Sequence, residues 1–173
     1  MPRKLVVELI IMITQNFTIS YETFDNIEEL SETDQMLCNK AKDALTSSHS
    51  PYSKFKVGTA VLLTNDQVVL GSNQENVAYP SGLCAERVAL FTIGSNYPNA
   101  VIKSMAITAQ TANFKIENPV TSCGACLQVM AEYEQRQKLP IDVLFYCIDG
   151  KIIKVKGVKS LLPFGFVEDR LGG

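Results

Sequence analysis

The stretch Val57-Gly-Thr-Ala-Val-Leu-Leu-Thr-Asn-Asp-Gln-Val-Val-Leu-Gly71 predicts a β-hairpin. Two apolar runs, over 57–63 and 67–71, are separated by a polar segment over 64–66 that is typical of a hairpin turn. Helical spacing of apolar residues predicts helices over 28–47, 83–93 and 124–136, and apolar runs predict further strands over 102–109, 141–148 and 152–158. Helices that alternate with buried strands indicate an α/β sandwich with a mixed sheet.

Length and charge favour one domain that does not bind nucleic acid. The 173 residues suit a single domain, and no repeat or low-complexity tract divides them. The net charge of -2 argues against a protein that binds phosphate backbones. The lysines near the C-terminus are interpreted as the solvated face of an edge strand, a common protection against edge-to-edge pairing: Lys151, Lys154, Lys156 and Lys159.

The N-terminus has two positive charges before a short apolar run. Glu8 interrupts that run and no small-residue cleavage site follows, so a signal peptide is not expected. The run is also too short to cross a bilayer. We expect a cytoplasmic protein without a membrane partner, in which residues 1–30 are an extension of unknown role and 31–173 a single domain. Both Met1 and Met12 fit as the true start.

Two cysteine-containing segments begin predicted helices, Leu83-Cys-Ala-Glu-Arg87 and Ser122-Cys-Gly-Ala-Cys126. The free N–H groups and the dipole at a helix N-terminus favour a thiolate. Cys123 and Cys126 are three residues apart, share one helix face and could hold a metal ion, with Cys84 as a third ligand. Three ligands leave a fourth tetrahedral position open, which is typical of catalytic zinc.

The other cysteines and the single histidine have simpler interpretations. Cys38 and Cys147 fall within predicted elements and are interpreted as small buried residues, and His49 as a surface loop residue. Five unevenly spaced cysteines fit a reducing compartment better than a disulfide framework. Taken alone, Cys-x-x-Cys could also be a redox pair or half of a structural zinc site. The segment over 116–119 disfavours a redox pair, because its helix would normally follow a strand directly.

The spacing Cys84-Ala-Glu86 followed by Cys123-Gly-Ala-Cys126 matches the zinc deaminase signature, in which the glutamate moves protons. Further runs extend the match over about residues 33–170, at 50–58, 73–80, 82–87, 123–129 and 161–166. With these five motifs in order, the chain resembles the small, three-cysteine class of cytidine deaminases. Two positions depart from the family pattern: Ser122 replaces a proline, and Leu127 stands where an arginine is usual.

This resemblance implies a three-layer α/β/α sandwich with a mixed five-stranded sheet and one Zn²⁺ per subunit. The implied reaction is hydrolytic deamination of free cytidine or deoxycytidine to the uridine nucleoside, with release of ammonia, in pyrimidine salvage. Glu86 would move a proton from water to N3 of the ring and a second proton to the departing amine.

The resemblance also implies roles for residues around the cluster. Phe55 would stack on the pyrimidine, while Asn73 and Glu75, two apart at a strand end, would bind the ribose. Tyr79 would line the nucleoside pocket, and the Ala85 backbone would help to hold the reacting groups.

The resemblance implies roles for two more residues, which would not belong to the substrate pocket of their own subunit. Arg87 would hydrogen-bond to the thiolates and withdraw excess negative charge from the zinc site. Phe166 corresponds to an aromatic residue that reaches into a neighbouring subunit's pocket, which implies a homotetramer with shared active sites.

Three other functions remain open from the sequence. A polynucleotide cytosine deaminase would need a basic channel and stacking aromatics, and the net charge of -2 and absence of tryptophan count against it. A deaminase of an aminonucleoside antibiotic such as blasticidin S would keep the fold, but Phe55, Arg87 and Phe166 favour cytidine. The third function is a structural zinc-binding module without catalytic activity.

Overall fold

The structure, a computed structural model, describes residues 13–168. Residues 1–12, which include both candidate starts, lie outside the described residues. Six strands form one sheet in the order β1-β6-β5-β4-β2-β3. The elements are β1 (Glu22–Phe24), α1 (Glu32–Ala44), β2 (Phe55–Leu63), β3 (Val68–Ser72), α2 (Ala85–Asn96), β4 (Ile102–Thr111), α3 (Gly124–Gln137), β5 (Asp142–Tyr146) and β6 (Ile152–Lys156).

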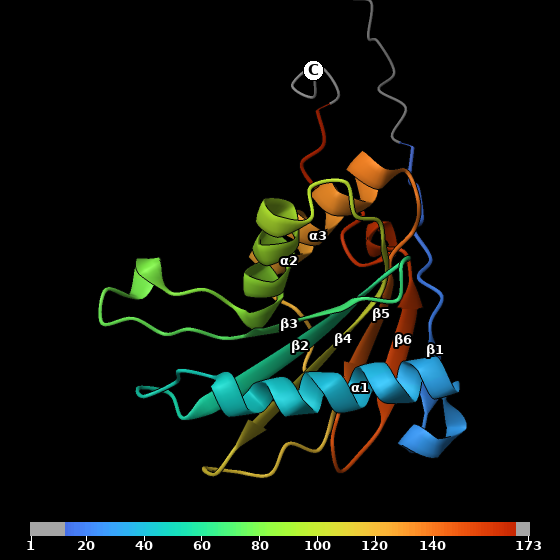
Figure 1. The fold of residues 1–173 in the computed structure, drawn as a ribbon. Helices are drawn as coiled ribbons and strands as arrows, with labels where there is room; N and C mark the ends of the chain where they lie inside the picture. Colours follow the sequence, from blue (N-terminus) through green and yellow to red (C-terminus); the bar gives the residue numbers. More distant parts are fainter. Residues whose placement is uncertain (1–12, 169–173) are drawn as a thin grey trace, which may run out of the picture.

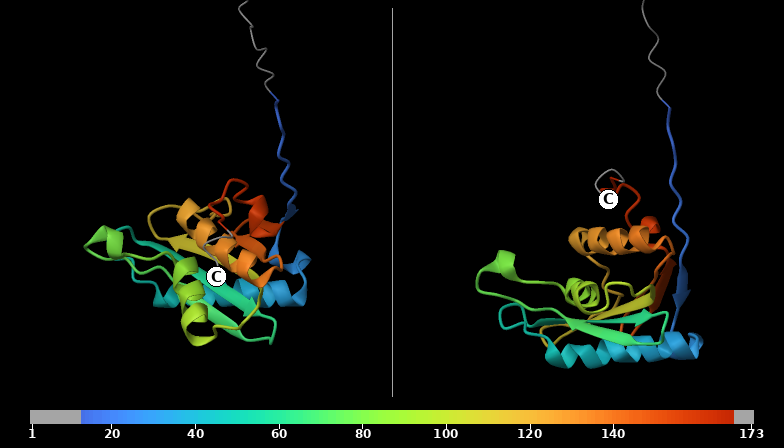
Figure 2. Two further views of the ribbon diagram at one scale, coloured as in Figure 1. Left: turned by 90° about the horizontal axis from the view of Figure 1, so that it is seen from above. Right: turned by 45° about the horizontal axis from the view of Figure 1, so that its top comes forward.

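Helices cover both faces of this sheet. Figure 1 and the right-hand view of Figure 2 show α1 on one face and α2 with α3 on the other. Alternate residues of β2 belong to the two resulting cores, because side chains along a strand point to opposite faces. Val61 and Leu63 pack in the α2–α3 core, and Ala60 and Leu62 pack in the α1 core. The three-layer α/β/α sandwich is therefore confirmed.

The prediction of five strands is wrong by one. The sixth strand, β1, pairs antiparallel with β6 at the edge of the sheet. It has only three residues, which is too short for an alternating pattern to be recognised. Residues 22–24 of the predicted N-terminal extension thus form a strand of the sheet. A separate role for the rest of residues 1–30 stays a prediction. Consequently β6 is not an edge strand, and its Lys154 pairs with Asp34 of α1 at 2.8 Å.

The directions of the strands determine where α2 and α3 begin. Both β3 and β4 run antiparallel to β2, so they are parallel to each other. Their carboxyl ends lie at the same edge of the sheet, because Ser72 pairs with Gly58 and Thr111 with Phe55, near the start of β2. The connection through α2 leaves β3 at this edge, and the connection through α3 leaves β4 there. Segments far apart in the sequence are thereby brought together.

Close packing of α2 on the sheet depends on Gly71 of β3. A Cβ at this position would lie within 2.6 Å of Ala89 N and closer still to the Ala85 carbonyl oxygen, distances that real Cβ atoms do not reach. Both of those atoms belong to the α2 backbone and cannot rotate away. Gly71 therefore permits the close approach of α2, the helix that begins directly after Cys84. None of the helices within 13–168 is both long and apolar enough to span a membrane.

We predict that Gly71→Ala will lower the free energy of unfolding by about 1–3 kcal/mol, because the added methyl group overpacks a rigid contact. Urea unfolding measures this change. Gly124→Ala is the matched control, since a Cβ there would meet no atom within 4 Å. An equal stability for the two variants would contradict the tight contact between β3 and α2.

Candidate active site

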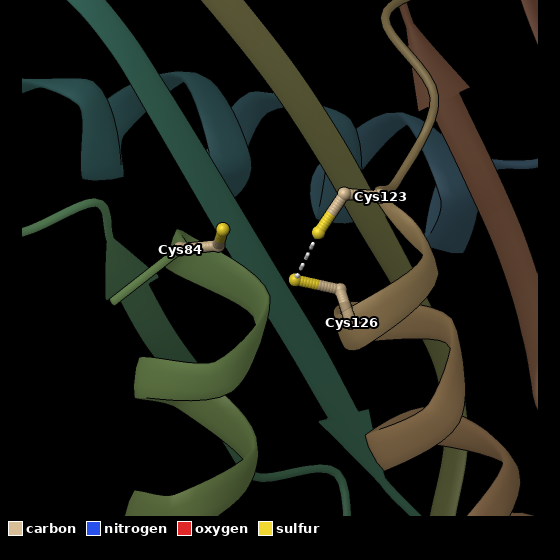
Figure 3. Close-up of side chains that lie close together, drawn as sticks. All are labelled: Cys84, Cys123 and Cys126. Carbon is tan, nitrogen blue, oxygen red and sulfur yellow. Dashed lines mark hydrogen bonds between the residues drawn. The ribbon is translucent and has the colours of Figure 1, made fainter. Parts of the chain in front are cut away.

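Three cysteines meet where α2 and α3 begin. Cys84 is the N-cap residue of α2, Cys123 is the N-cap residue of α3, and Cys126 lies in the first turn of α3. Their sulfur atoms all lie within 4.8 Å of one another. Figure 3 shows Cys84 facing the other two, with a dashed line for the 3.5 Å hydrogen bond from Cys123 Sγ to Cys126 Sγ. The three cysteines therefore lie together in the structure, as the sequence predicted.

The surroundings of the cluster favour negative charge on sulfur. Neither N-cap cysteine uses its side chain to cap its helix, so the sulfur atoms remain available to a ligand. A hydrogen bond from Cys126 lowers the pKa of Cys84 to about 5 against the effect of partial burial, and Arg87 adds to this shift. The same hydrogen bond and burial raise the pKa of Cys126. The cluster therefore stabilises a thiolate, the form of cysteine that binds metals.

These three donors fit a zinc ion. Sulfur suits zinc, and three protein ligands leave one tetrahedral position for water or substrate. Arg87 extends from α2 and donates a hydrogen bond from Nη2 to Cys84 Sγ at 3.6 Å. Its Nε is buried and has no hydrogen-bond partner among the described residues. The guanidinium thus lies against the sulfur cluster, while the effect on the zinc site that the resemblance implies stays a prediction.

Glu86 brings a carboxylate to the same place. It lies in the first turn of α2 and is 4% exposed, although carboxylates are rarely buried without a partner. No hydrogen bond from another residue within 13–168 occupies this carboxylate. Its negative charge is close enough to raise the pKa of Cys126. A buried, unpaired carboxylate beside a metal cluster is suited to proton transfer.

A cavity of about 700 Å³ opens above the cluster. Many of the predicted site residues line it: Asn73, Glu75, Tyr79, Cys84, Glu86, Arg87 and Cys123. Sequence reasoning did not assign Tyr52, Ser53 or Thr121, which also line it. The first two belong to the Pro51-Tyr-Ser53 turn, and a turn motif gives no indication of which distant segment it faces.

The side chain of Asn73 uses most of its hydrogen-bonding groups on other residues of the protein. Its Oδ1 accepts hydrogen bonds from Val57 N at 2.8 Å and from Ser48 Oγ at 2.6 Å. Its Nδ2 donates to the Phe55 carbonyl oxygen at 2.9 Å. The side chain therefore joins the start of β2 to the loop before it and to the end of β3.

The Glu75 carboxylate is held in a comparable way by the loop over 52–53. Its Oε2 accepts hydrogen bonds from Tyr52 N at 2.9 Å and Ser53 N at 3.3 Å. Its Oε1 accepts a hydrogen bond from the Ser53 hydroxyl. The contact with the Ser53 hydroxyl is the largest of the effects that lower the pKa of Glu75.

Other predicted site residues lie outside the cavity lining. The ring of Phe55 is 6.2 Å from that of Phe114, although Phe55 projects from the same face of β2 as Val57, which lines the cavity. Ala85 is fully buried at the start of α2. Phe166 is 71% exposed, while its backbone exchanges two hydrogen bonds with the side chain of Gln128 on α3. Their substrate-binding roles therefore stay predictions.

The residues assigned no chemistry are where the sequence predicted them. Cys38 and Cys147 are buried, and burial raises the pKa of Cys38 to about 12, while His49 is exposed. Leu127 packs against the α2–α3 core. The Ser122 hydroxyl is buried without a hydrogen-bond partner in the described part of the chain, and nothing else in the structure explains it.

A sulfur cluster with an open side, a buried carboxylate beside it and a cavity above define a zinc-dependent enzyme. Residues 31–140 match the family model described as "Cytidine and deoxycytidylate deaminase zinc-binding region". The chain belongs to this family, as the resemblance in its motifs predicted.

Individual relatives agree with this membership. The chain is 38% identical over 137 residues to a cytidine deaminase of Halalkalibacterium halodurans, which covers 78% of this chain and 95% of the relative. It is 40% identical over 99 residues to a cytidine deaminase of Sporosarcina psychrophila, covering 57% and 68% respectively. Among solved structures, cytidine deaminase from Burkholderia pseudomallei superposes with a TM-score of 0.68 at 30% identity, over 79% of this chain and all of that one.

We predict one zinc ion per chain in the purified protein. Cys123→Ser will weaken zinc binding by about 100-fold or more, since even residues that only support metal ligands contribute about 10–100-fold. Elemental analysis and competition with a chromophoric chelator measure content and affinity. Cys147→Ala, which alters a buried cysteine outside the cluster, will keep the full zinc content. Equal zinc binding by both variants would contradict the assigned ligands.

Proposed function

We propose that the protein catalyses hydrolytic deamination of free cytidine or deoxycytidine, forming the uridine nucleoside and ammonia. The observation that carries this proposal is the position of Glu86, buried and unpaired beside the three cysteines and at the wall of the cavity. The relatives named cytidine deaminase support it, because the Halalkalibacterium halodurans protein aligns over 95% of its own length.

Glu86 carries the protons of the reaction. When bound by the three cysteines, zinc lowers the pKa of water so that a nucleophile is available at neutral pH. Glu86 accepts a proton from water and delivers it to N3 of the pyrimidine, which makes C4 electrophilic. The hydroxide left from water attacks C4 and forms the new C–O bond. Glu86 then takes the proton of that hydroxyl group and transfers it to the amine at C4, so that the C4–N bond breaks and ammonia leaves. Glu86 is buried and accepts no hydrogen bond from another residue within 13–168, so its carboxylate is available for both transfers.

Arg87 balances the charge of the cluster. Three thiolates and one Zn²⁺ carry a net charge of about -1, which weakens the pull of the ion on water. The hydrogen bond from Arg87 to Cys84 draws electron density away from that sulfur. Arg87 therefore acts on the reaction through the ligand rather than through the substrate.

Asn73 and Glu75 together have hydrogen-bonding capacity for one sugar hydroxyl. An amide nitrogen has two hydrogens, and Asn73 Nδ2 uses one of them on Phe55. A carboxylate has about four acceptor sites, and Glu75 has filled three. The remaining donor and the remaining acceptor match the acceptor and donor of a single hydroxyl group. An ionised Glu75 also repels a 5′-phosphate that lies close to it, which supports nucleosides over nucleotides.

Contacts to the base and between subunits complete the proposal. Phe55 would turn from Phe114 toward the cavity to stack on the pyrimidine, Tyr79 would close its rim, and the Ala85 backbone would hold the reacting groups. Phe166 would enter the cavity of a neighbouring subunit in a homotetramer. The exposure of its ring beside an anchored backbone supports this role. Cytoplasmic location stays a prediction.

We predict that Glu86→Gln will keep zinc but lower kcat on cytidine by about 100- to 10,000-fold, the usual contribution of a general acid–base group. Ammonia release from cytidine, deoxycytidine, their monophosphates and a short single-stranded oligonucleotide measures activity and substrate class together. Glu132→Gln, at an exposed position of α3, is the control and should behave as the wild-type protein. Near-normal turnover by Glu86→Gln would refute the assigned role.

We also predict a homotetramer, with a mass four times that of the 19.1 kDa chain, in gel filtration with light scattering. Phe166→Ala will raise KM for cytidine, because each cavity would lose an aromatic residue supplied by a neighbour. A monomeric wild-type protein with full activity would contradict both the tetramer and the sharing of active sites.

A further inference from the structure

The loop that faces Glu75 encloses its carboxylate. Two consecutive backbone N–H groups, of Tyr52 and Ser53, point at Oε2, and the Ser53 hydroxyl reaches Oε1. The next residue, Lys54, has φ of 58°, a left-handed conformation uncommon outside glycine. Successive N–H groups in a turn of this kind form a concave site for an anion. Here the anion is a side chain of the protein's own cavity wall.

The Ser53 hydroxyl has a fixed orientation within this loop. Its oxygen accepts a hydrogen bond from Phe55 N at 3.0 Å. Its single hydrogen goes to Glu75, since an ionised carboxylate can only accept. One hydroxyl thus connects the first residue of β2 to the carboxylate proposed to bind the sugar.

We propose that Ser53 is a positioning residue for sugar recognition, and this rests on the proposed function. By occupying one acceptor site of Oε1, the Ser53 hydroxyl fixes the rotamer of Glu75 and leaves one site for a hydroxyl of the substrate. Glu75 and Ser53 both line the cavity, so this remaining site is accessible to a ligand. Ser53 acts through Glu75 and takes no part in the chemical step.

The same contacts keep Glu75 charged. The hydrogen bond from the Ser53 hydroxyl lowers the pKa of Glu75 most. Desolvation opposes this effect, while the N–H groups of Tyr52 and Ser53 and the nearby His49 add to it. An ionised carboxylate is an acceptor only, and hydrogen bonds to charged groups are stronger than neutral ones. A sugar hydroxyl that donates to Glu75 therefore meets a carboxylate that stays ionised and keeps one orientation.

A purely structural role for Ser53 has a distinct signature. Asn113 Nδ2 donates to the Ser53 carbonyl oxygen at 3.3 Å and so holds the same loop without contacting Glu75. If the loop only needs to be held in place, Asn113→Ala and Ser53→Ala will have similar effects. If the hydroxyl orients Glu75, the two variants will differ, and only substrates with a 2′- or 3′-hydroxyl will register the difference.

The experiment compares wild type, Ser53→Ala, Ser53→Thr and Asn113→Ala on cytidine and on 2′,3′-dideoxycytidine, which lacks both secondary hydroxyls. We expect Ser53→Ala to raise KM for cytidine about five- to tenfold with kcat within about twofold, and to leave kcat/KM for the dideoxy compound unchanged. Ser53→Thr keeps the hydroxyl and should retain most of the wild-type preference for cytidine. Asn113→Ala should change KM for cytidine by less than about twofold.

Each contrary result is informative. If Ser53→Ala lowers kcat/KM for both substrates in the same proportion, or if Asn113→Ala matches it, the positioning role is refuted while the deaminase function stands. If the wild-type protein with its zinc releases no ammonia from cytidine, the proposed function fails, and the inference about Ser53 fails with it. Zinc content and thermal unfolding of each variant identify any that have simply lost their fold.

Discussion

The structure depends on one constraint, the parallel course of β3 and β4. Because these strands end at the same edge of the sheet, the connections that follow them bring α2 and α3 to the cysteine site side by side. Cysteines 39 residues apart in the sequence, at positions 84 and 123, become neighbours at two positive helix ends. Gly71 then determines how closely the first of these helices approaches the sheet.

Around this arrangement, single side chains combine structural and chemical functions. Arg87 lies on the same turn of α2 as Glu86, so one turn supplies the carboxylate proposed to transfer protons and the guanidinium that hydrogen-bonds to the sulfur cluster. Asn73 and Glu75 hold three chain segments together with most of their hydrogen-bonding groups. Both residues also line the cavity. The same hydrogen bonds therefore shape the wall of the cavity and limit how many polar groups remain for a ligand.

Local signals predicted much of this from the sequence. The hairpin over 57–71, the helix starts at Cys84 and Cys123 and the burial of Cys38 follow from patterns within a few residues. Features that depend on distant partners were missed. The strand β1 forms by pairing with β6. The role proposed for Ser53 depends on its hydrogen bond to Glu75, which is 22 residues away in the sequence. The packing of Phe55 on Phe114 likewise joins β2 to a loop whose course no periodicity indicates.

The double use of Asn73 and Glu75 has a consequence for how this protein can change over evolution. A substitution at either position would remove hydrogen bonds that hold the cavity wall together and, under the proposed function, would also alter sugar recognition. Selection for a new sugar would then be accompanied by a loss of stability. Val120 and Thr121 line the same cavity from the loop before α3 and take no part in the hydrogen bonds of the Asn73 and Glu75 side chains. Variation in substrate preference among descendants of this chain should therefore accumulate in that loop.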